Sequence, residues 1–228
     1  MELTEFKDSI RRKAIRMQIG GFRPSGDPMS SQFGAVTRCS RGEAWPSHNG
    51  KPMHALCQVN LSELPFKPEG LEDIAFLTVF ISQENYPDDS PNGSDWCLRS
   101  YRSLDDLVEL QKIDTGSAIK VFEMKPEVIE EDYPCHDDVE DVPEEIEGEY
   151  YDLFENQGGL KLGGWPTLIQ SEIFWAPWNK HPINPRYVFQ IDSTEKGNWF
   201  WGDGGVGYFG RGTTKEGKDD WAVSWQCY

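Results

Sequence analysis

The chain has 228 residues, a formal net charge of −17 and 13% aromatic residues, including nine tryptophans. This length can bury a sizeable core, and so many aromatic residues are foreign to disordered chains. The sequence contains no stretch near the roughly 20 apolar residues of a membrane span, and no apolar signal core at its N-terminus. The five cysteines are scattered without CxxC spacing, which indicates reduced thiols. We therefore expect a compact cytoplasmic protein.

The negative charge is concentrated in one segment, residues 127–155. This segment holds 14 acidic residues and no lysine or arginine, whereas the rest of the chain holds 25 acids against 22 bases. Such a block is expected in solvent, because each buried carboxylate would need a partner that the segment lacks. Two interpretations stay open: a solvated loop, and a docking surface for a basic partner. Nucleic acid is disfavoured as a partner, because the segment would repel phosphates.

The N-terminal residues predict an amphipathic helix over residues 1–20. Apolar side chains recur at steps of three or four between Glu2 and Ile19, and basic residues mostly occupy the other faces. Gly20 and Gly21 are expected to end this helix. Its basic face could contact a membrane, but we expect the helix to pack on its own domain, near the acidic segment.

Short runs rich in Val, Ile, Phe, Tyr and Trp predict strands along the rest of the chain. They cover residues 53–59, 74–82, 118–124, 186–191, 205–210 and 220–226. A second, short helix is expected over Ser103 to Lys112, with Ser103 as its N-cap. This pattern favours a β-rich α+β fold over a regularly alternating α/β fold.

A loose internal repeat accompanies these runs. In the first copy, Phe33-Gly34-Ala35 precedes a strand that contains Gln58-Val59-Asn60, and the second copy places residues 162–166 before Gln190-Ile191-Asp192. Each copy thus puts a small-residue turn before a strand that ends in Gln, an apolar residue and Asn or Asp. The repeat predicts two related halves built around one core.

The same segments carry a family resemblance. The order FGAVTRCSRGEAWP, ALCQVNLSELP, KLGGWPTLIQ, FQIDS and WGDGGVGYF, from Phe33 towards the C-terminus, resembles the YwqG-like family of bacterial proteins. The resemblance implies a single α+β domain over residues 1–228, with a large mixed sheet, internal duplication and a few peripheral helices. Some members are thought to be immunity proteins that neutralise toxins in interbacterial competition. Two departures are Gly34-Ala35, where a Gly-Gly pair is common, and the acidic segment, which lies in a variable region.

We expect the motif residues to hold the fold. They are Gln58, Asn60, Gly163, Gly164, Pro166, Gln190, Asp192, Trp201, Gly202, Asp203 and Gly205. The glycines around Asp203 lack both phosphate-binding fingerprints, GxxxxGK[ST] and GxGxxG. They are expected to provide positive-φ turns, with Asp203 accepting hydrogen bonds from nearby backbone N–H groups.

The sequence offers no catalytic constellation. The four histidines have no metal-ligand spacing, and the calcium-like run from Asp88 to Asp95 would place Arg99 where a bidentate carboxylate is required. Cys135 and His136 are adjacent, so on an extended chain their side chains point to opposite sides. We therefore expect a non-enzymatic protein without metal or cofactor.

Seven of the nine tryptophans lie between Trp165 and Trp225, and most are expected in the core. Alternatively, Trp175 and Trp178 form an exposed aromatic loop, because Pro177 and the residues that follow break regular structure. Exposed tryptophans beside an acidic surface would resemble a binding hot spot with a charged rim.

The leading hypothesis is an immunity protein that binds a cognate toxin with a basic active-site cleft and occludes it. The partner-binding residues would be Glu130, Glu131, Asp132, Asp137, Asp138, Glu140, Asp141, Glu144, Glu145, Trp175 and Trp178. The alternative is a small-ligand-binding or enzymatic housekeeping protein with a pocket between the two halves, near Gln58, Gln170, Gln190 and Asp203. A structural or adaptor protein is a third hypothesis.

Overall fold

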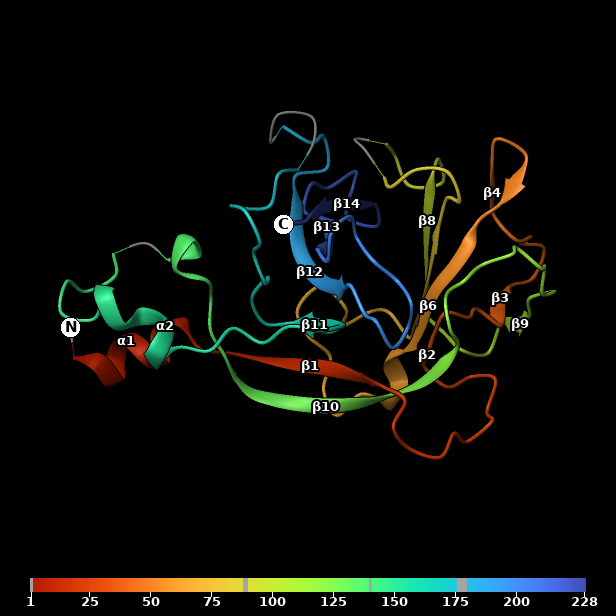
Figure 1. Ribbon diagram of the computed structural model, residues 1–228. Helices are drawn as coiled ribbons and strands as arrows, with labels where there is room; N and C mark the ends of the chain where they lie inside the picture. Colours follow the sequence, from red (N-terminus) through yellow and green to blue (C-terminus); the bar gives the residue numbers. More distant parts are fainter. Residues whose placement is uncertain (1, 88–89, 140, 176–179) are drawn as a thin grey trace.

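The computed structural model describes residues 2–87, 90–139, 141–175 and 180–228, and this part of the chain is rich in strands (Figure 1). Its main element is a ten-stranded sheet in the order β14-β13-β12-β11-β1-β10-β2-β6-β7-β8, accompanied by the small sheets β3-β9 and β4-β5. Every pairing is antiparallel. The expected mixed sheet is wrong, because parallel pairs need long crossover connections, usually helices, and the described residues contain two short α-helices only.

The elements up to the centre of the chain are α1 (Leu3–Ile10), β1 (Arg12–Ile19), β2 (Gln32–Phe33), β3 (Arg38–Ser40), β4 (Ser47–His48), β5 (Lys51–Pro52), β6 (His54–Asn60), η1 (Leu61–Glu63), β7 (Phe76–Ile81), β8 (Trp96–Tyr101), β9 (Leu107–Glu109) and β10 (Phe122–Asp132). The remaining elements are η2 (His136–Asp138), η3 (Glu147–Glu149), α2 (Tyr150–Leu153), β11 (Lys161–Gly163), β12 (Pro185–Asp192), β13 (Val206–Gly212) and β14 (Trp221–Gln226).

The N-terminal helix is shorter than its apolar spacing predicts. It ends at Ile10, Arg11 is extended, and the chain continues as β1 between β10 and β11. Ile15 and Met17 fit a strand as well as a helix, because they also alternate along the chain. Two neighbouring strands satisfy the backbone of β1, so tertiary pairing overrides the helical pattern, and Gly20 with its positive φ ends a strand instead of a helix.

The helix expected over Ser103 to Lys112 is also wrong. Ser103 Oγ accepts a hydrogen bond from the Asp105 N–H at 3.1 Å, and Leu107 then begins β9, which pairs with β3. Serine at this position caps a turn and not a helix. The six predicted strands correspond to β6, β7, β10, β12, β13 and β14, while β8 and the extension of β10 to Asp132 were not predicted.

The sheet consists of two halves around β1 and β10. On one side follow β2, β6, β7 and β8, and on the other β11, β12, β13 and β14. Their registers correspond, because Gln32 is opposite Gln58 in the first half as Lys161 is opposite Gln190 in the second. At the two sheet edges, Trp96 opens β8 and Trp221 opens β14. This structural repeat matches the two copies in the sequence.

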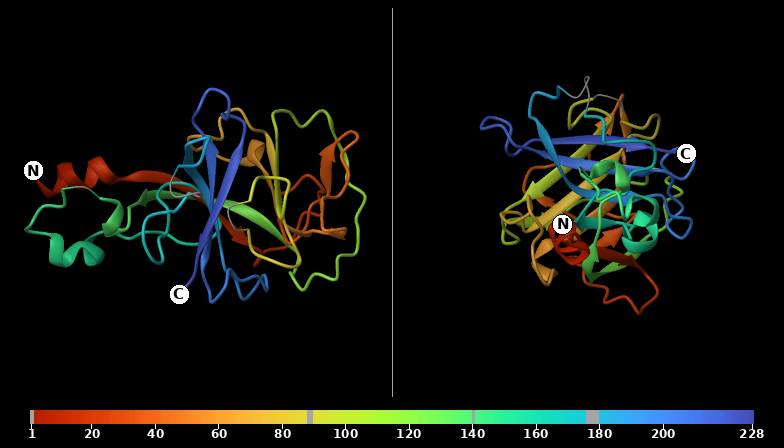
Figure 2. Two further views of the ribbon diagram at one scale, coloured as in Figure 1. Left: turned by 90° about the horizontal axis from the view of Figure 1, so that it is seen from above. Right: turned by 90° about the vertical axis from the view of Figure 1, so that its left-hand side faces the viewer.

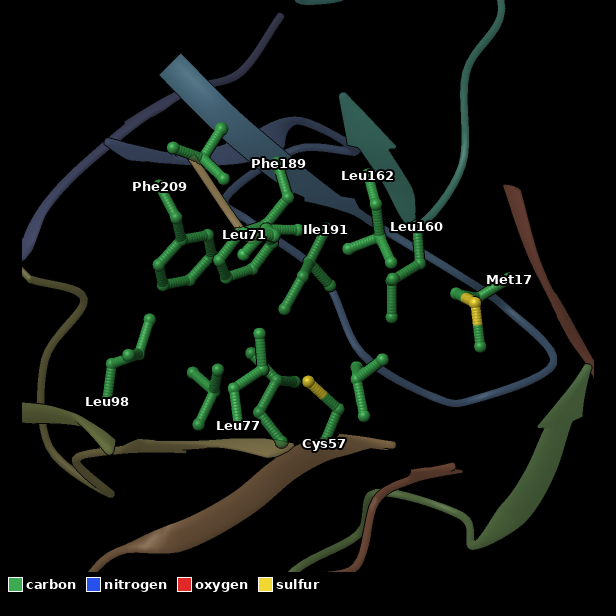
Figure 3. Close-up of a cluster of buried hydrophobic side chains, with 14 of the residues drawn as sticks. Met17, Cys57, Leu71, Leu77, Leu98, Leu160, Leu162, Phe189, Ile191 and Phe209 are labelled. Carbon is green, nitrogen blue, oxygen red and sulfur yellow. The ribbon is translucent and has the colours of Figure 1, made fainter. Parts of the chain in front are cut away.

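The main hydrophobic core lies between the two halves. In Figure 3, Phe189 and Phe209 of the second half face Leu77 and Leu98 of the first. The rings of Phe189 and Phe209 are stacked, with centroids 4.5 Å apart, and the Trp96 ring contacts Phe209 from the other half at 6.3 Å. Because each half covers the apolar face of the other, burial of this core holds the halves together.

A smaller unit lies at one end of the molecule, where α1 and α2 are side by side (Figures 1 and 2). It has its own apolar cluster, to which α1 contributes Phe6 and Ile10 and residues 133–155 contribute Tyr133, Tyr150 and Phe154. We call α1 together with residues 133–155 the acidic arm. Most of the acidic segment therefore belongs to this arm, and its beginning belongs to β10.

Candidate functional site: the acidic arm and the inter-half cleft

The first carboxylates of the acidic segment pair with basic residues of the N-terminus. Glu127 lies 3.0 Å from Arg16, Glu130 2.6 Å from Lys13, and Glu131 3.0 Å from Lys7. This agrees with the expectation that the basic N-terminal residues lie near the acidic segment. Such surface pairs contribute about 0–1 kcal/mol each, but they neutralise Glu130 and Glu131. These two residues therefore add little to the negative field of the arm.

Asp132 is fully buried, so its place in the predicted partner-binding surface is wrong. Its carboxylate lies 3.0 Å from the buried Lys161 ammonium and accepts hydrogen bonds from the N–H groups of Gln157 and Trp165 at 2.9 and 2.7 Å. A bulge explains the inward position: Arg12 is opposite Asp132, whereas Ala14 is opposite Ile129, so β10 holds one extra residue. Burial lowers the pKa of Lys161, and Asp132 acts in the opposite direction.

The later carboxylates of the arm point into solvent. Among the residues that the structure describes, none of these forms an ion pair: Asp141, Glu144, Glu145, Glu147, Glu149, Asp152 and Glu155. Asp138 is partly buried at the end of η2. Asp137 belongs to η2, but its side chain is outside the described part of the chain, as is Glu140 altogether. Much of the unbalanced charge of the protein is therefore carried by exposed residues of the arm.

The acidic arm has an apolar cluster of its own beside its exposed carboxylates. The Phe154 ring contacts the Phe6 ring at 5.7 Å and the Tyr133 ring at 5.2 Å. The buried Tyr150 hydroxyl donates a hydrogen bond to the Pro134 carbonyl at 3.0 Å. These contacts attach residues 133 and 150–154 to α1.

Two apolar side chains are exposed among these carboxylates. Tyr151 is 71% exposed and Leu153 is 39% exposed, both on α2. Sequence reasoning missed them, although Ile146, Tyr150 and Phe154 have the spacing of an amphipathic helical turn, with Tyr151 next to this apolar stripe. An exposed aromatic ring surrounded by charges has the composition of a binding hot spot.

Of the two tryptophans chosen from the sequence, the structure describes Trp175. Trp175 is partly buried, and a Cβ on Gly210 would lie 2.7 Å from its ring. Trp178 lies outside the described residues. Tyr151 is an exposed aromatic residue within the acidic segment itself.

The two motif glutamines have equivalent positions in the two halves. Both are fully buried. Gln58 Oε1 accepts a hydrogen bond from the Thr37 N–H at 2.8 Å, and Gln190 Oε1 accepts one from the Thr167 N–H at 2.8 Å. Each glutamine thus fixes the connection that follows the short strand β2 or β11. Their hydrogen bonds are used within the fold.

Asn60 and Asp192 support the segments that precede β2 and β11. Asn60 Nδ2 donates to the Met29 carbonyl at 3.1 Å, and Asp192 Oδ2 accepts from the Gly159 N–H at 2.6 Å. Gly163 and Gly164 both have positive φ, and a Cβ on Gly164 would lie 2.2 Å from Asp132 Oδ2. Glycine is therefore required beside the buried ion pair.

The C-terminal motif residues have unequal roles. Trp201 is fully buried in the main core, Pro166 is buried and its carbonyl accepts a hydrogen bond from Asn156, and Gly202 has positive φ. Gly205 is buried against the backbone of Gln226. Asp203 differs from the expectation, because it is exposed and accepts no hydrogen bond from the described residues.

Asp192 gives a testable pH dependence. Burial raises the pKa of this carboxyl to about 6, although hydrogen bonds from Gly159 and Gln190 partly oppose the shift. Between pH 4 and pH 6 the folded protein therefore retains a proton that the unfolded chain, with a carboxyl pKa near 3.9, has lost. The stability from this group falls by about 2–3 kcal/mol as the pH rises through this window. In urea unfolding, Asp192→Asn should remove that part of the pH dependence. Parallel pH curves for the two proteins would contradict the assignment.

A cleft of about 720 Å³ lies between β1, the two halves and the arm; we call it the inter-half cleft. Its walls include Arg12 of β1, Phe66 of the first half, Trp165 after β11, Trp175, and Arg186 and Tyr187 of β12. None of Gln58, Gln170, Gln190 and Asp203, which the sequence placed at such a pocket, lines it. The cleft therefore exists between the halves, but different side chains form it.

A second cleft, of about 850 Å³, occupies the corresponding place in the first half. Gly34 and Ala35 line this first-half cleft after β2, as Gly163 and Gly164 line the inter-half cleft after β11. Its walls are more apolar and include Trp45, Ile113, Ile119 and Val121. The structural repeat therefore generates a cleft in each half.

The described residues contain neither a candidate metal site nor a candidate membrane-spanning helix. No group of three or more His, Cys, Asp or Glu side chains in this part of the chain is placed to hold a metal ion. Likewise, no described helix has the length and apolar character needed to cross a membrane. The five cysteines are all free thiols.

The chain matches a protein family over most of its length. The family model is described as a domain of unknown function, DUF1963, and it matches residues 31–213. The protein therefore belongs to the DUF1963 family. The match includes both glutamine motifs and most of the strands of both halves, whereas α1, β1 and β14 lie outside it. No curated protein matches the chain.

Proposed function

We propose that this DUF1963 protein, in its YwqG-like form, is a non-enzymatic binding protein that acts in the cytosol as an immunity protein. It would bind a cognate toxin with a basic active-site cleft and occlude that cleft. The observation that carries the proposal is the acidic arm, which exposes Tyr151 together with seven carboxylates that form no ion pair with the described residues. The free cysteines favour a reducing compartment.

The arm combines two properties that a fast and tight inhibitor needs. Its carboxylates form a negative field that attracts a basic partner and raises the rate of association. The packed frame of Phe6, Tyr133 and Phe154 holds those charges in place before binding, which reduces the entropy lost in the complex. Tyr151 and Leu153 would then supply the apolar contact at the centre of the interface.

Co-expression tests the proposal. A toxin gene adjacent to the gene of this protein should be lethal alone and tolerated together with this protein. Reversing four exposed charges (Asp141→Lys, Glu144→Lys, Glu145→Lys, Glu147→Lys) should abolish protection and lower the association rate with the purified toxin by about tenfold or more at low salt. Tyr151→Ala should mainly raise the dissociation rate.

A matched control variant distinguishes an effect of the arm from an effect of the net charge. The variant Asp106→Lys, Glu195→Lys, Asp203→Lys and Glu216→Lys changes the charge equally at exposed residues that form no ion pair with the described chain. This control should protect as well as the original protein. If both variants protect equally, or if both lose protection equally, the arm is not the interface with the toxin.

The alternative is a small-ligand-binding or enzymatic housekeeping protein. The cleft between the halves supports this alternative. The residues that the sequence proposed for such a pocket do not line the cleft. A cleft ligand and an arm partner do not exclude each other, because Asp138 lines the cleft but the exposed carboxylates from Asp141 to Glu155 do not.

A further inference from the structure

We propose that the inter-half cleft binds a small organic anion, whose carboxylate or phosphate group contacts the Arg12 guanidinium. This site is independent of the partner proposed for the acidic arm. Its ligand would have an apolar body of modest size, because the cleft volume of about 720 Å³ lies within the range of small-molecule sites.

Basic residues slightly outnumber acidic residues in the lining of the cleft, although the protein as a whole is strongly negative. Four basic residues (Arg12, Lys13, Lys67, Arg186) and three acidic residues (Glu69, Asp138, Glu172) line it. Three of the bases already have partners: Lys13 lies 2.6 Å from Glu130, Arg186 pairs with Glu69, and Lys67 donates to the Ile74 carbonyl at 2.6 Å. The remaining base is Arg12.

Arg12 is held in place but has no carboxylate partner. Its guanidinium stacks on the Trp165 ring at 3.3 Å and donates one long hydrogen bond, of 3.4 Å, to the Gly164 carbonyl. It forms no ion pair with any residue that the structure describes. Burial and the charge of Arg186 lower the pKa of Arg12, whereas Glu69, Asp138 and Asp132 act in the opposite direction. Because the Arg12 side chain is exposed to solvent and has no ion-pair partner among the described residues, an anion that enters the cleft can reach its guanidinium.

The first-half cleft provides an internal comparison. Arg16 of β1 is opposite Lys161, as Glu123 of β10 is opposite Gln32, so Arg12 in the repeat corresponds to Ile119. Ile119 lines the first-half cleft as Arg12 lines the inter-half cleft. The fold therefore forms the cleft twice and has a guanidinium at this position once. The first half thus forms its cleft without an arginine at this position, and we attribute the Arg12 guanidinium to a ligand of the inter-half cleft.

The shape of the cleft defines the ligand class. A guanidinium presents parallel N–H donors that match the two oxygens of a carboxylate or phosphate. Phe66, Ile173 and Trp175 form apolar parts of the wall, which would contact an aromatic or aliphatic body. Phenyl phosphate and benzoate combine both features and serve as probes, and benzyl alcohol is their neutral counterpart.

A titration of the whole protein, followed by the NMR signals of the tryptophan indole N–H groups, tests the site. Trp165 reports directly, because its Nε1 donates to the Ile10 carbonyl at 2.6 Å beside Arg12. Phenyl phosphate or benzoate should shift the Trp165 signal saturably, whereas benzyl alcohol should not. Arg12→Gln should weaken binding by about tenfold or more, since it removes a charged hydrogen-bond donor.

Two variants make the result specific. Lys13→Gln removes a charge from the same cleft but from a residue paired with Glu130, so the affinity should stay within about twofold. Arg186→Gln leaves the Glu69 carboxylate unpaired inside the cleft, where it repels an anion, so this variant should weaken binding even if Arg12→Gln disturbs folding. Equal binding by Arg12→Gln, equal binding of benzyl alcohol, or no saturable shift at about 10 mM probe would each overturn the proposal.

Discussion

Replacing Lys161 with methionine should destabilise the protein by about 3–5 kcal/mol, because the change leaves the Asp132 carboxylate buried without its counter-ion. Both side chains have no exposed surface, and their charged atoms lie 3.0 Å apart. The N–H groups of Gln157 and Trp165 still donate to the carboxylate, so the loss should fall near the lower end of this range. Urea unfolding measures it through the midpoint at an unchanged slope.

A double variant and a surface control complete the test. Asp132→Asn combined with Lys161→Met removes both charges and should be more stable than Lys161→Met alone, because no uncompensated charge remains. Lys215→Met, at an exposed lysine, should change the free energy of unfolding by less than about 0.5 kcal/mol. If Lys161→Met behaves like Lys215→Met, the ion pair has no structural role.

Replacing Gly205 with alanine should destabilise the protein by about 3–5 kcal/mol or prevent folding. A Cβ at this position would lie 1.7 Å from the Gln226 carbonyl oxygen and 2.7 Å from Cys227 Cα. Both atoms belong to the backbone at the end of β14, so no side-chain rotation relieves the clash. The edge strand β14 would have to move away from β13, which would expose the buried Trp221.

Gly148 is the matched control for Gly205. No atom lies within 4 Å of a Cβ built there, and its φ is not in the left-handed region. Gly148→Ala should therefore leave stability within about 0.5 kcal/mol of the original protein. The measurement is the free energy of unfolding, together with the tryptophan fluorescence maximum, which should shift to longer wavelength in Gly205→Ala only. Equal stability of the two variants would mean that β14 can relax at no cost.

The strands that the sequence predicts well are those with dense apolar runs. Phe76–Ile81 is buried at every position, and Val206–Gly212 at nearly every position, so apolar character alone identifies them. The two-copy pattern also predicts the halves, because the small-residue turns and glutamines recur at the same places in the sheet. The N-terminal strand was not predictable in this way. Its apolar residues fit both periods, and the choice depends on β10 and β11, which lie far along the chain.

The candidate site in the acidic segment was also predicted only in part from the sequence. Counting charges locates the surface, and the exposed residues from Asp141 to Glu155 lie where the count predicts. The count cannot reveal that Asp132 faces Lys161, because this depends on a bulge in β10. It also cannot identify Arg12 as a cleft residue, since Trp165, its stacking partner, is distant in sequence.

The sequence by itself determined the location of the negative charge, the strand-rich character of the chain and the order of its repeated motifs. These properties are composition and local periodicity, which any window of the chain contains. Only the tertiary structure decided which carboxylates are exposed, which one is buried, and which arginine lines a cleft. Those outcomes depend on strand register and on packing between residues far apart in sequence, where the free energy of burial and pairing outweighs local preference.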